Sequence, residues 1–241
     1  MDWSDEGIVL AVRRHGEADA ILHALTFAHG RHAGLVKGGQ GRTLRPLLQP
    51  GNVLELEWRA RLVDHLGSYR IAAKRLPAAG LLDDPPRLAA LGAACALIET
   101  ALPERDPHPR LYAALLTWLG RLALDPEWAA DYVRLELLLL AELGFALDLS
   151  ACAVSGAREE LAFVSPRSGR AVGAAAAAPY RDRLLPLPAF LLGGASDRTQ
   201  IVQGLRLAGH FLARHILAPA DRSLPAARAR LAALLGAEDR M

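Results

Sequence analysis

Hydrophobic and polar positions alternate along the N-terminal third of the chain. In NVLELEWRAR, residues 52–61, apolar side chains alternate with glutamate and arginine, which is the period of a strand with one buried face. Four more stretches with strand character are separated by Gly, Asp or Pro: 7–14, 18–27, 30–38 and 67–76. Five short strands predict a small closed barrel, for which an OB-fold and an SH3-like barrel are the two alternatives.

The spacing of apolar residues becomes helical after Leu76. Three Asp-Pro pairs, at 84–85, 106–107 and 125–126, each precede an apolar run. Asp can accept hydrogen bonds from the free N–H groups of a first helical turn, and Pro loses nothing at the first helical position. The expected helices lie near 86–101, 108–124 and 127–147, followed by one that Ser196 opens and that ends at Leu217, and one from Ser223–Pro225 to Leu235.

The net charge of the chain is small, but its basic residues are unevenly distributed. The 241 residues carry a formal net charge of only +2, which excludes a bulk polycation. Between Ala20 and Leu54, however, there is no Asp or Glu, while this segment holds Arg31, Lys37, Arg42 and Arg45. The segment is either a positive field that attracts an anionic partner or a solvated face that carries arginine by chance.

A glycine-rich stretch in this segment, GLVKGGQG at 34–41, raises the question of a nucleotide-binding loop. A phosphate-binding P-loop needs Gly-Lys-Ser/Thr, but Lys37 precedes Gly38 and no such triplet occurs. A dinucleotide turn needs a third glycine and a helix, and neither follows Gly41. The sequence also has no G-x-S-x-G elbow and no HExxH motif, so we expect a protein that is not an enzyme.

The two cysteines, Cys95 and Cys152, cannot form a disulfide framework or a four-cysteine zinc site. They fit a reducing cytoplasm. The acidic N-terminus is unlike a signal peptide, and the stretch 184–196, which is free of charged residues, is too short to cross a bilayer. We therefore expect a cytoplasmic protein with no membrane partner.

The remaining class is binding to an anion by basic side chains of the barrel. Aromatic residues that could stack on bases are few, so contacts with the nucleic-acid backbone should dominate and should depend on salt. The candidate DNA-binding residues are Arg31, Lys37, Arg42 and Arg45, with Arg13, Arg14, Lys74 and Arg75 as a second set. No catalytic and no metal-binding residue is proposed.

Several segments of the N-terminal third resemble the RecO family of bacterial DNA repair and recombination mediators. GIVLAVRRHGEADAIL, residues 7–22, is similar to that family's opening strand and Gly-Glu-x-Asp turn. HGRHAGLVKGG is similar to its third strand, which ends in a basic residue and glycine. LRPLLQPGNVLELEW is similar to its Leu-Gln-Pro segment and the alternating strand that follows. Downstream, LAFVSPRSGRAV, residues 161–172, is also similar, though more diffusely.

The resemblance implies an α+β multi-domain fold. It consists of a five-stranded OB-fold barrel followed by an α-helical domain with a small zinc-ribbon-like insertion. Many members of the family carry two CxxC pairs in the insertion, but here only Cys152 remains and Ser155 stands at the second position. We therefore expect no zinc and no other cofactor. The expected divisions are 1–78 (DNA-binding barrel), 79–150 and 183–241 (the two parts of the helical domain) and 151–182 (degenerate insertion).

The resemblance also implies a function. RecO-family proteins bind single- and double-stranded DNA, anneal complementary strands, and assist RecA loading together with RecR on DNA coated by single-stranded DNA-binding protein. The expected partners are thus DNA, RecR, the C-terminal tail of single-stranded DNA-binding protein and, indirectly, RecA, at a nucleoid-associated cytoplasmic location. The alternative is a protein-interaction adaptor whose barrel binds an acidic peptide instead of DNA.

Overall fold

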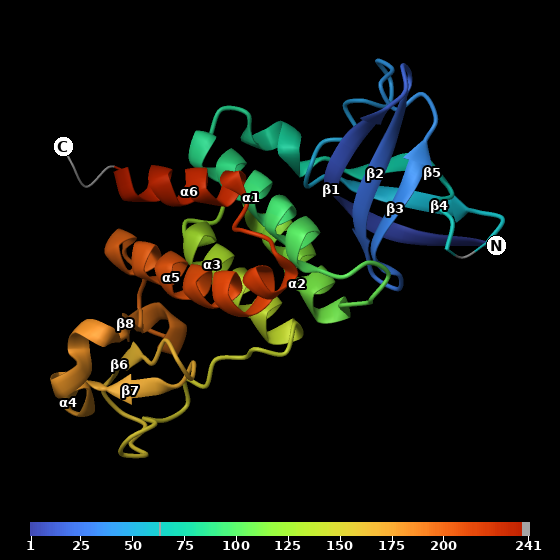
Figure 1. The fold of residues 1–241 in the computed structure, drawn as a ribbon. Coiled ribbons are helices and arrows are strands. Elements are labelled where there is room, and N and C mark those ends of the chain that lie inside the picture. The colour runs from blue at the N-terminus through green and yellow to red at the C-terminus, as the bar shows by residue number, and fades with distance from the viewer. Residues whose placement is uncertain (63, 238–241) are drawn as a thin grey trace. The chain divides into compact units, whose positions relative to one another are not determined.

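A computed structural model describes residues 1–62 and 64–237 of the chain (Figure 1). Contacts between Cα atoms divide the chain into two compact units, which are described separately. The first unit comprises Met1–Asp125 and Pro225–Arg228, and the second comprises Pro126–Leu224 and Ala229–Met241.

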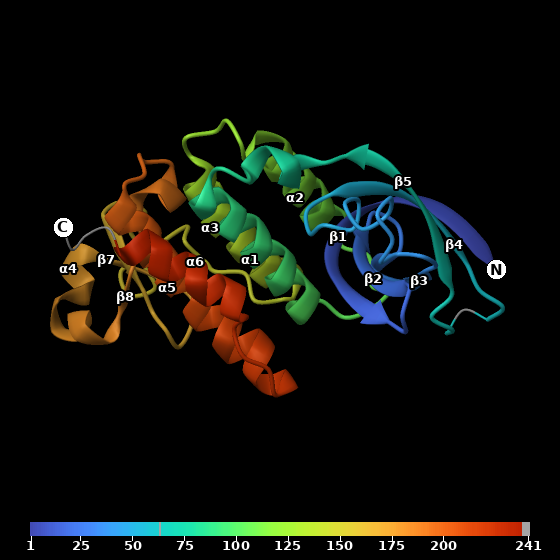
Figure 2. The same cartoon turned by 90° about the horizontal axis from the view of Figure 1, so that it is seen from above.

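Five strands form a closed barrel at the start of the first unit. They pair in the order β1-β2-β3-β5-β4, with β4 pairing back onto β1. Figure 2 shows the strands curving around one another when the barrel is seen from above. The strands are β1 (Asp2–His15), β2 (Asp19–Thr26), β3 (Gly30–Val36), β4 (Val53–Arg59) and β5 (Ser68–Arg75).

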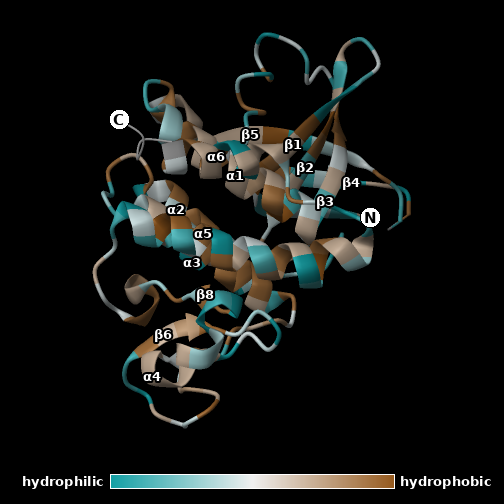
Figure 3. Ribbon diagram, turned by 60° about the vertical axis from the view of Figure 1, so that its left-hand side comes forward, coloured by the Kyte–Doolittle hydropathy of each residue, from teal (hydrophilic) through white to brown (hydrophobic). Residues whose placement is uncertain are grey.

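This barrel confirms the predicted strands and the OB-fold, whose hallmark is a five-stranded Greek-key barrel. The long strand β1 pairs with both β2 and β4, and a register shift between Val9 and Ala11 lets it bend from one partner to the other. The inward positions of β4 are the apolar ones expected from the alternation, since Leu54, Leu56 and Trp58 are all at most 2% exposed. Figure 3 shows that the barrel strands carry both hydrophobic and hydrophilic stretches.

Two helices complete the first unit, α1 (Pro85–Ala101) and α2 (Pro109–Arg121). Asp84 caps α1 as predicted, because its side chain accepts a hydrogen bond from the Arg87 amide at 3.1 Å. The predicted start of α2 near residue 108 agrees with the structure, but the predicted cap at Asp106 was wrong. The N-cap position is His108, and Pro109 is the first helical residue, since the second of two consecutive X-Pro pairs begins the helix.

The second unit contains α3 (Trp128–Glu142) and α5 (Arg198–Phe211), which continues as a π-helical turn to Leu217. The predicted cap Asp125 was wrong, because α3 begins after Glu127 and the Asp125 carboxylate pairs with Arg121 one turn earlier. Asp197 rather than Ser196 caps α5, and it accepts from the Gln200 amide at 2.7 Å. The last described helix is α6 (Ala226–Ala237).

In the second unit, the expected insertion supplies two strands of a small three-stranded sheet. It pairs in the order β7-β6-β8, next to the short helix α4. Cys152, Val172 and Ala177 form its buried centre, against which Phe163 packs. The four-part division of the chain stays a prediction, because the two compact units follow a different division. The bounds are β6 (Leu161–Val164), β7 (Ala171–Gly173), β8 (Leu185–Pro186) and α4 (Ala174–Ala177).

Candidate nucleic-acid interface

The loop between β3 and β4, residues 37–52, holds three of the predicted DNA contacts; we call it the basic loop. Its glycines are needed where it meets the β1–β2 turn. The Gly38 amide donates to Asp19 at 2.8 Å and the Gln40 amide donates to the Ala18 carbonyl at 2.9 Å. A Cβ at Gly39 would stand 2.7 Å from Ala20, so a side chain there would push the loop away from the barrel.

The second half of the basic loop is anchored to the core. Leu48 is 4% exposed and belongs to the barrel's apolar cluster, which Leu44 and Leu47 also contact. The Asn52 side chain donates to two carbonyls of the loop, at 3.2 and 3.1 Å. Because both of its ends are hydrogen-bonded or packed, the loop presents its charged side chains from a fixed backbone.

Lys37, Arg42 and Arg45 are all exposed on this loop. Arg14, near the β1–β2 turn, is exposed as well. In the part of the chain that the structure describes, none of these four forms an ion pair with a carboxylate within 4.0 Å. Their charges are therefore available to an external anion.

Three cations that the sequence analysis did not single out lie on the same barrel. Arg59, Arg61 and Arg70 are exposed and, among the described residues, have no carboxylate within ion-pair distance. Two of them are outward-facing strand residues, which the alternating pattern marks only as solvent-exposed. In the pairing of β4 with β5, Arg59 lies opposite Ser68 and Glu57 lies opposite Arg70. This register brings Arg59 and Arg70 close to each other.

A groove of about 470 Å³ lies between the basic loop and the arginines of β4 and β5. Lys37, Arg59 and Arg70 line it, together with the apolar Leu44 and Ile71. It lies beside the short parallel pairing of β3 with β5, which joins Leu35 to Ser68 and Val36 to Tyr69. Glu57 is the one acid among its lining residues, so three positive charges face one negative charge.

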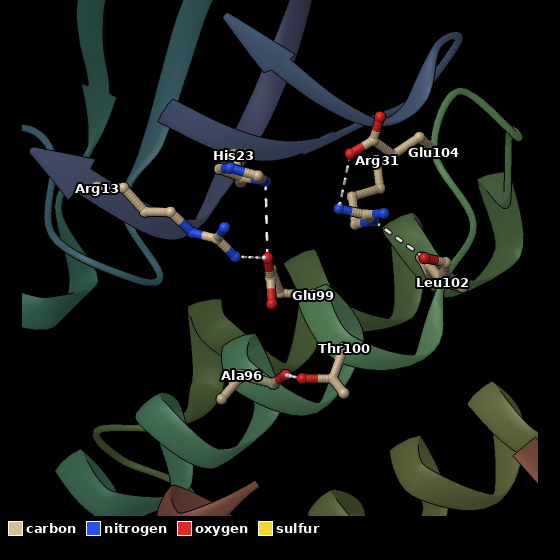
Figure 4. Close-up of polar contacts among 8 residues, drawn as sticks. All are labelled: Arg13, His23, Arg31, Ala96, Glu99, Thr100, Leu102 and Glu104. Atoms are coloured by element: carbon tan, nitrogen blue, oxygen red, sulfur yellow. Dashed lines mark hydrogen bonds and ion pairs between the residues drawn. The ribbon is translucent and has the colours of Figure 1, made fainter. Parts of the chain in front are cut away.

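Arg31 is a correction to the predicted set. It is 7% exposed, and its Nε donates to the Leu102 carbonyl at 2.9 Å while its guanidinium lies 3.3 Å from Glu104 (Figure 4). Its own carbonyl accepts from the Arg105 amide at 2.9 Å. Arg31 therefore holds the connection between α1 and α2 against β3, and its charge is not presented to an external anion.

Arg13 is exposed but paired. Its guanidinium contacts the Glu99 carboxylate on α1 at 2.9 Å, and the His23 ring lies 3.6 Å from the same oxygen (Figure 4). Burial lowers the pKa of His23, the Arg13 guanidinium lowers it further, and Glu99 raises it in part. The positive charge of Arg13 is thus partly offset by Glu99.

Lys74 and Arg75 share one carboxylate in the same way. Glu6 on β1 lies 2.5 Å from Lys74 and 3.2 Å from Arg75. Burial opposes the ionisation of Glu6, but the neighbouring Lys74 and Arg75 hold its pKa below the ordinary value. An external phosphate is attracted less strongly by two cations that share one carboxylate than by two unpaired cations.

The residues around Cys152 do not fit a zinc ion. The Cys152 sulfur accepts hydrogen bonds from the Gly173 amide at 3.3 Å and the Ser155 amide at 3.4 Å. The Gly173 amide, the Ser155 side chain and the amides of Ser155 and Val154 lower the pKa of the thiol to about 6. In the described parts of the chain, no group of three or more His, Cys, Asp or Glu side chains gathers as a metal site needs. One sulfur with two amide donors holds the turn by hydrogen bonding instead.

No described helix is both long and apolar enough to cross a membrane.

Comparison with known proteins assigns the chain to a family. Residues 1–74 match the model for the N-terminal part of recombination protein O, and residues 82–225 match the model for its C-terminal part. The chain belongs to the RecO family. It is 55% identical to the DNA repair protein RecO of Rhodospirillum rubrum, over 95% of this chain and 94% of that protein. It is 51% identical to the DNA repair protein RecO of Cereibacter sphaeroides, over 98% of both chains.

Family membership supports a role in DNA repair. The N-terminal RecO match covers the barrel almost to the end of β5, and so includes the basic loop and the groove. The C-terminal RecO match covers α1, α2, the small sheet and α5.

Proposed function

We propose that this RecO-family chain is a DNA-binding recombination mediator and not an enzyme. It would bind single- and double-stranded DNA, anneal complementary strands, and assist RecA loading with RecR on DNA coated by single-stranded DNA-binding protein at the nucleoid. The observation that carries the DNA-binding part is a set of exposed cations that have no carboxylate partner among the residues that the structure describes: Arg14, Lys37, Arg42, Arg45, Arg59, Arg61 and Arg70.

The physical mechanism is charge neutralisation. Two DNA strands repel one another through their phosphates, and each Lys or Arg that contacts a phosphate releases a condensed counterion. Cations spread over the basic loop and the neighbouring groove would hold two backbones near each other at reduced repulsion. Such contacts read no sequence, so binding should tolerate any base composition.

The test is a triple variant in which Lys37, Arg42 and Arg45 are changed to Ala. Affinity for labelled oligonucleotides, measured by fluorescence anisotropy at several salt concentrations, should fall for every sequence. The slope of log affinity against log salt should become shallower by roughly one for each lost phosphate contact. Annealing of complementary strands should slow in parallel.

A second triple variant removes the same charge elsewhere. Arg158, Arg167 and Arg183 lie in the second unit, are exposed, and make no ion pair within 4.0 Å among the described residues. Changing these three to Ala should leave the salt slope closer to that of the parent chain. Equal slopes for the parent chain and the basic-loop variant would overturn the proposal.

A specific observation also favours the adaptor alternative. An apolar hollow of about 270 Å³ in the first unit is lined by Leu76, Leu81, Leu116 and Leu119, with Arg75 among its lining residues. Its chemistry suits an apolar peptide that carries an acid, such as the tail of single-stranded DNA-binding protein. A chain that binds such a peptide but no oligonucleotide at low salt would be an adaptor. Gly120 on α2 lines the hollow and has open space around it, so Gly120→Met should fill the hollow and weaken peptide binding.

A further inference from the structure

An aromatic hollow of about 570 Å³ lies at the end of the barrel where β1 begins and β4 ends. Its aromatic lining consists of Trp3, His29, His32 and Trp58, and Arg105 and Asp2 also line it. Trp58 is the last inward-facing residue of β4 and stands opposite Trp3 in the β1–β4 pairing. His29 follows the β2–β3 turn, and His32 lies on β3. The hollow is therefore built from three neighbouring segments of the barrel.

The rings are arranged as a stack. Trp3 lies on His29 with ring centroids 4.0 Å apart and planes inclined by 18°. Trp58 lies on Trp3 at 5.7 Å and 20°, so three rings are nearly parallel. His32 meets both tryptophans edge-on, at 5.0 and 5.1 Å. Trp3 and His29 are only half-buried, so this stack is accessible from the hollow.

The His32 ring is held neutral and fixed. Its Nδ1 is 2.8 Å from the Tyr69 hydroxyl. Burial lowers the pKa of His32 to about 4, and the neighbouring Arg105 contributes to the lowering. The His32 ring thus adds no positive charge to the hollow at neutral pH.

Arg105 reaches the hollow from the connection between α1 and α2. Its amide donates to the Arg31 carbonyl, and its guanidinium donates to the His65 carbonyl at 3.0 Å. A guanidinium in the lining disfavours a cationic ligand such as an alkylammonium. Asp2 in turn disfavours placing a phosphate in the hollow itself. A flat, neutral group is disfavoured by neither Arg105 nor Asp2.

We propose that this hollow binds one unpaired nucleobase of single-stranded DNA by stacking on the half-buried ring of His29, the accessible end of the stack that Trp3 supports. Bases stack on aromatic side chains whatever their identity, so this contact would add affinity without sequence preference. The neighbouring phosphates would lie outside the hollow, toward the basic groove that Arg59 lines. Arg59 follows Trp58 directly, and the alternation of β4 turns the two side chains to opposite faces, one to the hollow and the other to the basic groove.

This inference rests on the proposed DNA binding but goes beyond it. The basic loop and the groove treat single and double strands alike, because both present phosphates. A base can enter the hollow only when it is not paired. The hollow would therefore give single strands an advantage that charge alone does not give, and a base held there would be released when it pairs with a complementary strand.

The test uses two single strands of equal length and charge, an oligothymidine and its abasic counterpart, with the full chain. The parent chain should bind the oligothymidine on the order of tenfold more tightly, which corresponds to one stacked base. Its tryptophan fluorescence should be quenched by the oligothymidine and not by the abasic strand. Trp3→Leu should bind both strands with the affinity that the parent chain has for the abasic strand.

Further variants separate stacking from folding. Trp3→Phe keeps a ring beneath His29 and should keep most of the preference, whereas His29→Leu removes the ring that the base contacts and should lose most of it. Phe27→Leu is the matched control, because Phe27 lies on the same turn and is 51% exposed but packs against Tyr112 outside the hollow. It should leave the preference unchanged.

The outcomes distinguish the two proposals. If the parent chain binds both strands equally well, the hollow does not bind a base, while the DNA-binding proposal stands. If it binds neither strand, both proposals fail. A preference that survives in both Trp3→Leu and His29→Leu also overturns the assignment, because base recognition would then lie elsewhere.

Discussion

Two groups of basic residues on the same barrel differ in what surrounds them. Lys37, Arg42 and Arg45 extend from an anchored loop and have no carboxylate within ion-pair distance among the described residues. Arg13 and Arg31 face α1 and the α1–α2 connection, where Glu99 and Glu104 neutralise them. The charge of a side chain is the same in both places, but only the first group is available to an external anion. Exposure and pairing thus separate a cation that is available to an external anion from a structural one.

The sharpest test of this comparison is Arg31→Met, which keeps a long apolar side chain and removes the charge. It should destabilise the first unit by about 2 kcal/mol, mainly because the buried Leu102 carbonyl loses its donor. The ion pair to Glu104 adds less, since Glu104 is half exposed. The midpoint of urea unfolding, followed by tryptophan fluorescence, measures this.

Lys37→Met is the matched control for Arg31→Met. It should change stability by less than about 0.5 kcal/mol, as surface substitutions do, and should weaken DNA binding instead. If Arg31→Met left stability unchanged and flattened the salt slope, Arg31 would be a binding residue after all.

The groove gives a second test, with an intermediate effect. Changing Arg59 and Arg70 together to Ala should weaken binding several-fold and should flatten the salt slope by roughly two. Changing Lys74 and Arg75 to Ala removes the same charge from the barrel, but those two cations share Glu6. The slope should therefore change less in the second double variant. Equal changes would show that pairing with Glu6 does not matter for binding.

The smallest expected effect comes from releasing a paired cation. Glu99→Gln removes the partner of Arg13 and should raise DNA affinity about twofold at low salt, with stability changed by at most about 1 kcal/mol. Glu99 also raises the pKa of His23 in part, so its removal should lower that pKa further. Titration of His23 by NMR measures the shift. An unchanged pKa would mean that the carboxylate does not act on this ring.

Local patterns predicted much of the fold. The five strands follow from the alternation of apolar and polar residues, because one face of each strand lines the barrel core. The cap at Asp84 follows from a local hydrogen bond within one turn. The caps assigned to Asp106 and Asp125 were wrong for a local reason too. Asp125 pairs with Arg121 in the preceding turn, and a second X-Pro pair after Asp106 competes for the start of α2.

The candidate site was only partly predictable. The segment without Asp or Glu drew attention to the basic loop, and Lys37, Arg42 and Arg45 are indeed exposed on it. That they contact DNA stays a prediction. It could not show that Arg31 is buried, since its partners Leu102 and Glu104 lie more than 70 residues away. Nor could it find the aromatic hollow, because its rings come from three separate segments that only the fold brings together.

A small barrel and the order of the helices could be predicted from the sequence, because both follow from patterns among neighbouring residues. The resemblance to the RecO family follows from the order of several short segments, and with it comes the expectation that zinc ligands are missing around Cys152. The tertiary structure decided which cations are free, which arginines share a groove and which aromatic rings stack. Ion pairing and stacking act over a few ångströms, and in this barrel the register of the strands and the packing of α1 choose which distant residues come within that range.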